Sequence, residues 1–571
     1  MKITSYDKYP EKRVNGAAFA GYSDIISQIK SHLADKEKAV VVLDFYPGVD
    51  TAEVLGGFSA LGAEMVNAEK IYISPTEFDE KIEKNLTDDR VFGFMCEKNL
   101  NDFTDQVALK NLRTEIENTD GVTLLYGVGA AKVTKGDLLI YLDLARWEIQ
   151  TRYKNGMPNW RADNADEPFL SKYKRGFFVE WRLADRHKET LFDDIDYLLD
   201  TNLKDNPKMI SGDTFRNALQ KFASEPFRLV PYFDPGVWGG QWMRKVCGLP
   251  DEPDNFAWSF DGVPEENSLY INVSGIRVEI PAINLVLYRP ANLLGQRVYN
   301  VFGAEFPIRF DFLDTMEGGN LSLQVHPKKE YIKENFGMNY TQEESYYMLD
   351  AGDDACVYLG LKEGVNKEEM AEELRKAQQT GAFDAEKYIN KIPAKKHDHF
   401  LIPPGTLHCS GRNSMVLEIS ATPYIFTFKL WDWGRVGLDG IPRPIHIDHG
   451  LANIAWERTT DFVENELVNA ITPLENGGER TGLHKLEFID TFRHTHDKPI
   501  IHDTNGSVNM LNLVEGEGLT VESINGEFAP FEVHFAETFI IPASVGKYKI
   551  TPKNGEIKTI KALVREEKNE S

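Results

Sequence analysis

The pattern of hydrophobic and polar positions changes near residue 215. Before this point, short apolar runs alternate with stretches of helical pattern such as 192–204. The predicted strands are residues 39–45, 70–74, 90–95, 121–127 and 137–144. Buried apolar runs separated by helices are typical of a parallel sheet with helices on its faces. We therefore expect an α/β domain over residues 1–215.

From about residue 227 the pattern changes to short strands with turn signals, such as SLYINV, GIRVEI, MVLEIS and KYKIT. Regular short strands of this kind predict β-sandwich or barrel modules. One helix interrupts them, with Asn366 at its start and Gly381 just after its end. We expect a helical insert over residues 365–392.

A weak internal repeat connects two parts of this β region. The segment DHFLIPPGTLH, residues 398–408, is similar to ETFIIPASVGK, residues 537–547. His408 of the first copy corresponds to Lys547 of the second, so the second copy has lost an imidazole. This pattern predicts two related β-modules, one with site chemistry and one without.

Charge and composition limit the classes of partner. The net charge of −25 argues against general affinity for nucleic acid or an anionic membrane. The four cysteines form no CxxC pair, which favours a reducing compartment over a disulfide framework. The N-terminus lacks an apolar signal region, and no apolar run approaches 18 residues. We expect a cytoplasmic protein.

The stretch LSLQVHP carries the first candidate chemistry. Gln324 and His326 are two residues apart in a predicted strand, so their side chains share a face. Glu344 opens an apolar run, and His408 follows a Pro-Gly turn. Two imidazoles, a carboxylate and an amide oxygen form a donor set for a borderline divalent ion. The spacing alone leaves a satisfied polar pair and a solvated carboxylate as the alternative.

Several motifs together resemble the type I mannose-6-phosphate isomerases. They are SLQVHP, the Glu before SYYMLD, VYLGLKEG, FLIPPGTLHCSG and WDWGRVGLDGIPRPIHID. The resemblance covers roughly residues 227–565 and implies an all-β double cupin (jelly-roll) fold. It divides this region into a metal-binding domain, 216–455, and a second cupin-like domain without metal ligands, 456–571. The family members are zinc enzymes that interconvert mannose 6-phosphate and fructose 6-phosphate, so the implied partner is a phosphorylated hexose.

The resemblance also assigns site residues. The ligands of one Zn²⁺ per chain are Gln324, His326, Glu344 and His408. The implied catalytic residues are Glu418, Lys429 and Arg435, and the implied substrate-binding residues are Ser322, Gln342 and Arg443.

Three positions depart from the family pattern. Gln342 and Asp311 each replace a lysine, and Lys429 replaces an arginine whose planar fork a lysine cannot reproduce. Three functions therefore remain open. The first is an isomerase acting on mannose 6-phosphate or a related sugar phosphate. The second is a weakly active or non-catalytic sugar-phosphate-binding regulatory protein that retains the metal site. The third is another metal cupin, such as an iron oxygenase.

The segment VVLDFYPGVDTAEVL resembles the phosphate-binding loop of uridine-kinase-like nucleotide kinases. Asp50-Thr51 stands where the glycine-lysine of that loop would reach the phosphates. We therefore interpret the first domain as a degenerate P-loop kinase-like fold. The arginines of this domain have two interpretations: they form a nucleotide or anion site, or they lie on solvated helix faces. They are Arg146, Arg152, Arg182 and Arg186.

Overall fold

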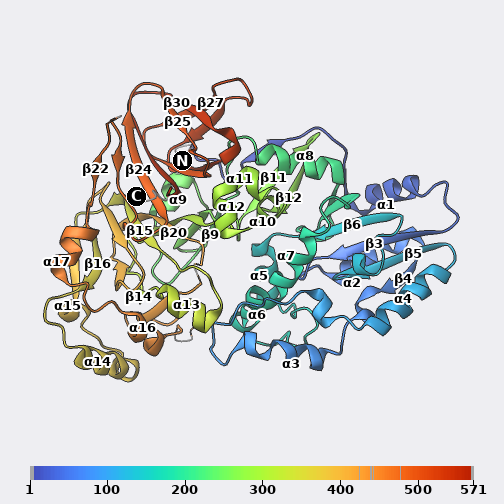
Figure 1. Cartoon of the computed structure of the whole chain (residues 1–571), viewed down its shortest axis with the longest axis horizontal. Coiled ribbons are helices and arrows are strands. Elements are labelled where there is room, and N and C mark those ends of the chain that lie inside the picture. The colour runs from blue at the N-terminus through green and yellow to red at the C-terminus, as the bar shows by residue number, and fades with distance from the viewer. Residues whose placement is uncertain (1–4, 424, 438–439, 441–442, 476, 567–571) are drawn as a thin grey trace. The chain divides into compact units, whose positions relative to one another are not determined.

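The computed structural model describes residues 5–423, 425–437, 440, 443–475 and 477–566 (Figure 1). Its contacts group the chain into two compact units. One unit comprises Glu11–Ala223 and Pro264–Arg289, and the other comprises Met1–Pro10, Ser224–Val263 and Pro290–Ser571. The sequence-based boundaries instead placed residues 264–289 in the first cupin domain.

A seven-stranded sheet forms the centre of the N-terminal unit, with the strand order β2-β8-β7-β6-β3-β5-β4. The strands are β2 (Ala18–Ala20), β3 (Ala39–Phe45), β4 (Glu64–Asn67), β5 (Val122–Gly127), β6 (Leu138–Asp143), β7 (Tyr197–Asp200) and β8 (Lys208–Ser211). The five strands from β4 to β7 pair in parallel, and β8 and β2 join antiparallel. The predicted parallel sheet is therefore present.

Helices connect these strands (Figure 1). They are α1 (Gly21–His32), α2 (Thr51–Phe58), α3 (Pro75–Leu86), α4 (Gln106–Asn118), α5 (Arg146–Lys154), α6 (Phe169–Arg175), α7 (Trp181–Glu189) and α8 (Gly212–Phe222). The succession of strand and helix is the one expected for an α/β domain.

Three elements predicted within this unit are wrong. Residues 70–74 form no strand, because the first two belong to a short 3₁₀ helix, Ala68–Ile71, and the others are irregular. Residues 90–95 are irregular, and the Asp89 carboxylate accepts hydrogen bonds from two of their amides. The predicted helix 192–204 contains strand β7, whose residues are all buried. Short apolar runs of this length do not distinguish strand, helix and loop by periodicity.

A hairpin from later in the chain completes the N-terminal unit. Strands β11 (Ser268–Val273) and β12 (Ile276–Pro281) join β1 (Glu11–Arg13) in a small sheet, and α10 (Ile283–Tyr288) follows. Trp147 Nε1 donates a hydrogen bond to Glu279 Oε1 at 3.0 Å, and Arg182 pairs with Glu265 at 3.5 Å. These polar contacts tie the hairpin segment to α5 and α7.

The C-terminal unit contains two β-modules. The first has sheets of order β18-β15-β20-β13-β10-β9 and β17-β16-β19-β14-β21. Its strands are β9 (Tyr232–Asp234), β10 (Trp258–Gly262), β13 (Ile308–Asp314), β14 (Leu323–Val325), β15 (Glu344–Ala351), β16 (Cys356–Leu361), β17 (Ile389–Pro393), β18 (His399–Ile402), β19 (His408–Ser410), β20 (Ser414–Ala421) and β21 (Phe428–Trp431).

The second module has sheets of order β22-β23-β24-β31-β26-β29 and β25-β30-β27-β28. Its strands are β22 (Thr472–Pro473), β23 (Glu479–Arg480), β24 (Ile489–His496), β25 (Ile500–Asp503), β26 (Asn509–Glu515), β27 (Gly518–Ser523), β28 (Phe531–His534), β29 (Thr538–Ile541), β30 (Lys547–Pro552) and β31 (Ile557–Val564). One apolar core contains residues from both sheets, such as Leu511 of β26 and Ile550 of β30, which makes this module a sandwich.

Helices of the C-terminal unit lie between these strands. They are α9 (Trp242–Cys247), α11 (Pro290–Leu294), α12 (Gln296–Phe302), α13 (Lys329–Phe336), α14 (Lys367–Thr380), α15 (Ala385–Tyr388), α16 (Ile447–Asn453) and α17 (Thr460–Phe462). Helices α14 and α15 account for the insert predicted over residues 365–392, but its last residues, 389–392, belong to strand β17. The N-cap of α14, Asn366, accepts a hydrogen bond from the Glu369 amide at 2.9 Å, and Gly381 ends this helix in the left-handed conformation.

The two modules share one strand order. The run β18-β15-β20-β13 corresponds to β29-β26-β31-β24, and β17-β16-β19-β14 corresponds to β28-β27-β30-β25. Strands β18 and β29 are the two segments that are similar in sequence, so the predicted repeat extends to the topology.

The register of the paired strands identifies equivalent positions. Glu344 pairs with Ile402, and Asn509 pairs with Ile541, which corresponds to Ile402 in the repeat. The second module therefore carries an amide where the first carries the carboxylate Glu344.

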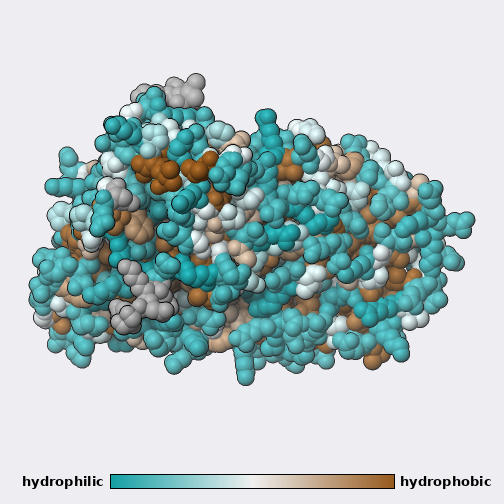
Figure 2. All heavy atoms as spheres, turned by 45° about the horizontal axis from the view of Figure 1, so that its top comes forward, coloured by the Kyte–Doolittle hydropathy of each residue, from teal (hydrophilic) through white to brown (hydrophobic). Residues whose placement is uncertain are grey.

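The surface is mostly hydrophilic in the view of Figure 2. Within the described ranges, no helix combines the length and the hydropathy needed to cross a bilayer.

Candidate metal centre

The four predicted ligands lie on or next to three strands of the first module. Gln324 is the middle residue of β14, and His326 follows this strand directly. Glu344 is the first residue of β15, and His408 is the first residue of β19. Because β14 pairs with β19 at Gln324 and His408, side chains from distant parts of the chain are neighbours here.

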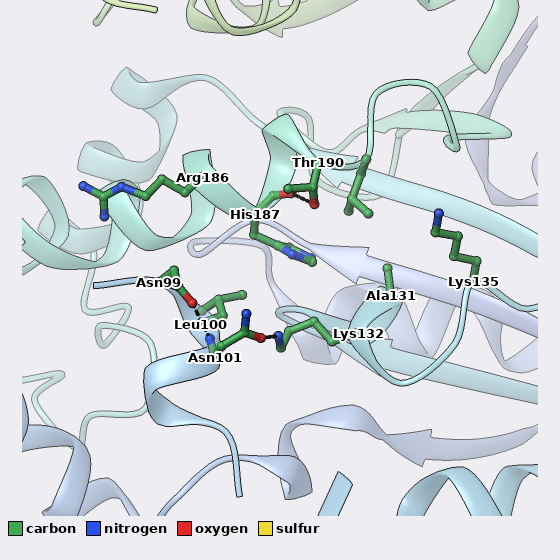
Figure 3. A pocket seen from close by; sticks show the side chains of 10 residues that line it. Asn99, Leu100, Asn101, Ala131, Lys132, Lys135, Arg186, His187 and Thr190 are labelled. Atoms are coloured by element: carbon green, nitrogen blue, oxygen red, sulfur yellow. Dashed lines mark hydrogen bonds between the residues drawn. The ribbon is translucent and has the colours of Figure 1, made fainter. Parts of the chain in front are cut away.

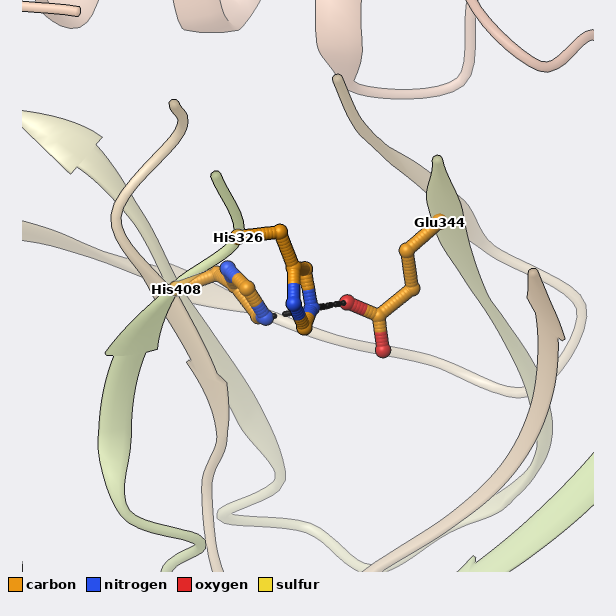
Figure 4. A group of neighbouring side chains, drawn as sticks. All are labelled: His326, Glu344 and His408. Carbon is orange, nitrogen blue, oxygen red and sulfur yellow. Dashed lines mark hydrogen bonds and ion pairs between the residues drawn. The ribbon is translucent and has the colours of Figure 1, made fainter. Parts of the chain in front are cut away.

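Three of these side chains converge on one point (Figure 4). Glu344 Oε2 lies 2.6 Å from His326 Nε2 and 3.0 Å from His408 Nε2. One ligand atom from each residue lies within 4.8 Å of the others, and all three side chains are buried. Two imidazole nitrogens and a carboxylate oxygen in this arrangement can hold a divalent cation.

Backbone carbonyls orient both imidazoles. His326 Nδ1 lies 3.3 Å from the Phe426 carbonyl, and His408 Nδ1 lies 2.9 Å from the Thr406 carbonyl. A proton on each Nδ1 leaves the Nε2 lone pair free to face Glu344. Metal-binding histidines usually have an outer hydrogen bond of this kind, which fixes the tautomer.

The electrostatics of His326, Glu344 and His408 favour a cation between their side chains. Burial favours protonation of Glu344, but the imidazoles of His326 and His408 outweigh it and hold the pKa of this carboxyl well below its usual range. The second oxygen, Glu344 Oε1, is buried without a hydrogen-bond partner. A buried carboxylate whose Oε2 faces two imidazole nitrogens and whose Oε1 has no partner fits a divalent ion such as Zn²⁺.

Gln324 borders this group through its amide. Its Nε2 lies 3.3 Å from His408 Nε2, and its Oε1 accepts a hydrogen bond from Ser322 Oγ at 3.3 Å. A half-turn of the amide would exchange its nitrogen and oxygen and turn the oxygen toward the imidazoles. Gln324 is thus placed to supply a fourth ligand, and Ser322 lies beside it.

Glu418 lies next to the ligand group, at the centre of a polar cluster. Its Oε1 accepts hydrogen bonds from Arg309 at 2.9 Å, Ser420 at 2.8 Å and Gln342 at 3.4 Å. Burial, followed by the charge of Glu344, raises the pKa of Glu418 to about 7. The predicted residues Glu418 and Gln342 are therefore in direct contact.

The sequence analysis missed Arg309. This arginine pairs with Asp311 as well as with Glu418, and Asp311 stands directly opposite Glu418 across β13 and β20. A signal was available in RFDF, where a buried strand carries two opposite charges on one face. Arg309 supplies positive charge in a module where Gln342 and Asp311 replace two lysines of the family pattern.

A second group of cations surrounds Asp432. Arg435 pairs with this carboxylate at 2.6 Å and Arg443 at 3.0 Å. Burial, with Arg443 as the next cause, lowers the pKa of Lys429 to about 7. Lys429 also pairs through its backbone with Gln324, so this group adjoins the strand of the ligands. Part of the WDWGRVGLDGIPRPIHID motif, residues 438–439 and 441–442, lies outside the described residues.

The arginines predicted for an anion site of the N-terminal unit have other partners. Arg146 pairs with Asp185 at 2.6 Å, and Arg152 pairs with Glu148 at 2.8 Å. Arg182 pairs with Glu265, as described above. These three side chains are largely buried in ion pairs. Arg186 borders a pocket of this unit.

A carboxylate of the loop after β3 caps the N-terminus of the next helix, α2. Asp50 caps helix α2 by accepting a hydrogen bond from the Glu53 amide at 3.1 Å. An anion bound at this helix end would compete with that carboxylate. The kinase-like fold of this unit stays a prediction.

Comparison with known proteins gives a different result for each part of the chain. Residues 21–224 match a family described as a domain of unknown function, DUF8485. A mannose-6-phosphate isomerase of Streptococcus mutans serotype c is 29% identical over 230 residues, which are 40% of this chain and 67% of that protein. The mannose-6-phosphate isomerase ManA of Bacillus subtilis is 24% identical over 336 residues, 57% of this chain and 96% of that protein.

This chain is similar to mannose-6-phosphate isomerases. Among solved structures, the mannose 6-phosphate isomerase from Bacillus subtilis matches 59% of this chain and 99% of its own, with a TM-score of 0.47 and 19% identity. A phosphomannose isomerase mutant from Salmonella typhimurium matches 60% of this chain and 100% of its own, with a TM-score of 0.47 and 14% identity. The resemblance predicted from the motifs is confirmed by the curated mannose-6-phosphate isomerases.

Proposed function

We propose that the protein is a zinc-dependent aldose–ketose isomerase that interconverts mannose 6-phosphate and fructose 6-phosphate or a related sugar phosphate. The observation that carries the proposal is the buried convergence of His326, Glu344 and His408. The curated relatives, which are mannose-6-phosphate isomerases, support the same reaction class. His326, Glu344 and His408 would hold the ion, with Gln324 as the fourth ligand.

Isomerisation of an aldose to a ketose moves a proton between C1 and C2. A bound zinc ion supplies a Lewis acid for the negative charge that develops on substrate oxygen. Glu418 is our candidate for the group that carries the proton. Arg309, Ser420 and Gln342 hold its Oε1, which leaves its other oxygen to exchange a proton with the sugar.

The substrate phosphate needs a cationic anchor in a chain of net charge −25. Arg435 and Arg443 carry two positive charges against the single carboxylate of Asp432, and Lys429, with its pKa lowered to about 7, adds part of a third. This excess of positive charge fits a phosphate group, whose binding energy positions the reacting carbons. We assign Ser322 and Gln342 to the same sugar-phosphate shell.

A second function is favoured by one observation. Arg309, Arg435 and Arg443 are already engaged with carboxylates of the protein. A site whose cations are occupied in this way would bind a sugar phosphate and turn it over slowly, as a regulatory binding protein that retains the metal would do. The iron oxygenase alternative uses the same two histidines and carboxylate.

One experiment separates these functions. Purified protein of known metal content is incubated with mannose 6-phosphate in deuterated water and followed by NMR. The isomerase proposal expects fructose 6-phosphate with deuterium exchange at C1 or C2, abolished in His326→Ala and His408→Ala. The exposed His32→Ala serves as the control. Binding of mannose 6-phosphate to zinc-loaded protein without conversion would favour the regulatory function, and a protein that contains iron in place of zinc would favour the oxygenase.

A further inference from the structure

The N-terminal unit contains a pocket of about 420 Å³, far in sequence from the metal centre (Figure 3). It is lined by the segment around the 3₁₀ helix Leu100–Phe103, by the segment that follows β5, and by the C-terminal end of α7. Its lining extends from the segment after the carboxyl end of β5 to Lys135, shortly before β6, and to Leu191, shortly before β7. Its volume is in the range of small-molecule sites.

The lining of the pocket is positively charged. Lys132, Lys135, Arg186 and His187 all border it, and no carboxylate is among the described residues that do. In a chain with a net charge of −25, a pocket lined in this way concentrates positive potential where the rest of the protein repels anions.

Two of these cations have neutral partners. Lys132 Nζ hydrogen-bonds to the Asn101 side-chain oxygen, and Arg186 donates to the carbonyls of Lys98 and Cys96. Burial, followed by the charge of Arg113, lowers the pKa of Lys132. An anion in the pocket would favour the charged form of Lys132, whose partner Asn101 is neutral.

The other two basic side chains of the lining, Lys135 and His187, each contact a carboxylate. Asp194 pairs with Lys135 at 2.6 Å on the exposed rim. Asp44 lies 2.8 Å from His187 Nε2 and also accepts hydrogen bonds from the amides of Gly129 and Ala131. This buried carboxylate fixes the His187 ring through Nε2.

The orientation of His187 suits a ligand in the pocket. With Nε2 held by Asp44, Nδ1 is the ring nitrogen left for another partner, and in the protonated ring it is a donor. Figure 3 shows the imidazole extending from α7 toward the segment that carries Lys132. His187 and Lys132 reach the pocket from separate elements and are placed to bind one anion between them.

We propose that this pocket binds a small organic phosphate. Lys132 and the Nδ1–H of His187 would hold the phosphate oxygens, with Lys135 at the rim. Leu100 and Leu191 also line the pocket and would contact the organic part. A bare phosphate would leave most of about 420 Å³ unfilled, so the ligand has a body in addition to its charge.

The test uses the full-length protein and phenyl phosphate as the probe, measured by isothermal titration calorimetry. The phosphate anchor proposed beside Asp432 is disabled by Arg435→Ala and Arg443→Ala so that it does not contribute a second phosphate site. In this background we expect one site per chain. Lys132→Glu is expected to weaken it at least tenfold, and Lys132→Gln should weaken it to a smaller extent.

Lys70→Glu is the matched control, because it makes the same charge change on a lysine that does not line the pocket. It should leave the affinity unchanged. Circular dichroism confirms that each variant is folded. Equal affinity in Lys132→Glu, Lys132→Gln and Lys70→Glu, or no binding in the parent protein, would overturn the proposal.

Crystals of the wild type soaked in tungstate, a phosphate mimic with strong anomalous scattering, locate the site independently. A peak between Lys132 Nζ and His187 supports the proposal. Peaks confined to other surfaces would identify adventitious ions only and count against it.

Discussion

Arg309 NH1 donates a hydrogen bond to Glu418 Oε1 at 2.9 Å, between neighbouring strands β13 and β20. The same arginine pairs with Asp311, so one guanidinium joins two buried carboxylates. A planar fork can hold both partners at once, whereas an ammonium group is a single point charge. This contact fixes the side chain that we assign as the proton carrier.

Arg309→Lys is therefore expected to retain the charge but loosen Glu418. We predict that kcat for mannose 6-phosphate falls about tenfold to a hundredfold while KM and the zinc content stay close to wild type. Steady-state kinetics and metal analysis of the same preparation check this. A proportional loss of zinc and activity would mean that Arg309 supports the fold or the metal and not the position of Glu418.

Removal of the metal should destabilise the protein. If the ligand group holds zinc in the native state and not in the unfolded chain, a chelator is expected to lower the melting temperature of the wild type. In Glu344→Gln, which removes the carboxylate between the two imidazoles, the chelator should have no further effect. Differential scanning calorimetry with and without the chelator measures both, and an equal chelator effect in the two proteins would contradict the ligand assignment.

A pH effect on stability is expected from Glu279 in the N-terminal unit. Burial, followed by the charge of Asp200, raises the pKa of Glu279 from its ordinary 4.5 to about 7. The native state therefore favours the protonated carboxyl, and the contribution of this group to stability falls as the pH rises from about 4.5 through about 7.

Glu279→Gln keeps an acceptor for Trp147 and removes the charge. We predict that the variant gains about 1–2 kcal/mol in free energy of unfolding, relative to wild type, between pH 5 and pH 8. Urea unfolding of both proteins at pH 5 and pH 8 gives the difference between their free energies of unfolding at each pH. A difference that is equal at pH 5 and pH 8 would rule out a raised pKa as the cause.

Asp185→Ala tests the buried ion pair of α7 and α5. Asp185 lies 2.6 Å from Arg146 and accepts a hydrogen bond from Tyr46, and both charged side chains are nearly inaccessible to solvent. Its removal leaves a buried guanidinium unpaired, which is expected to cost about 3–5 kcal/mol. Asp213→Ala breaks a pair whose carboxylate is 87% exposed, and should cost less than about 1 kcal/mol. Urea unfolding measures both, and similar losses would refute this view of the Arg146 pair.

The sequence was most informative where a single periodic pattern or motif determined the position of an element or of a site residue. Strand β3 begins and ends where the apolar run does, and α14 begins and ends at its predicted caps. The four candidate ligand positions could be singled out because they lie in three motifs, with Gln324 and His326 together in SLQVHP. Their convergence on one point could not, because it depends on the pairing of β14 with β19 and of β15 with β18.

Other features depend on partners that are far apart in the chain. The hairpin of β11 and β12 has the pattern of any short strand pair, and contacts such as Trp147 with Glu279 assign it to the N-terminal unit. In the sequence, Arg309 is a single charged residue in an apolar segment. Its contact with Glu418 depends on the pairing of β13 with β20. The pocket beside Lys132 likewise forms from three separate segments, none of which contains a motif.

The central claim is that the two imidazoles of His326 and His408 and the carboxylate of Glu344 hold one zinc ion. X-ray absorption at the zinc edge tests it most directly on the isolated protein. The account predicts one zinc per chain with nitrogen and oxygen ligands at about 2.0–2.2 Å, two imidazole scattering patterns, and loss of one pattern or of the metal in His408→Ala. Protein that takes up no zinc, or zinc bound by thiolate at about 2.3 Å, would contradict it.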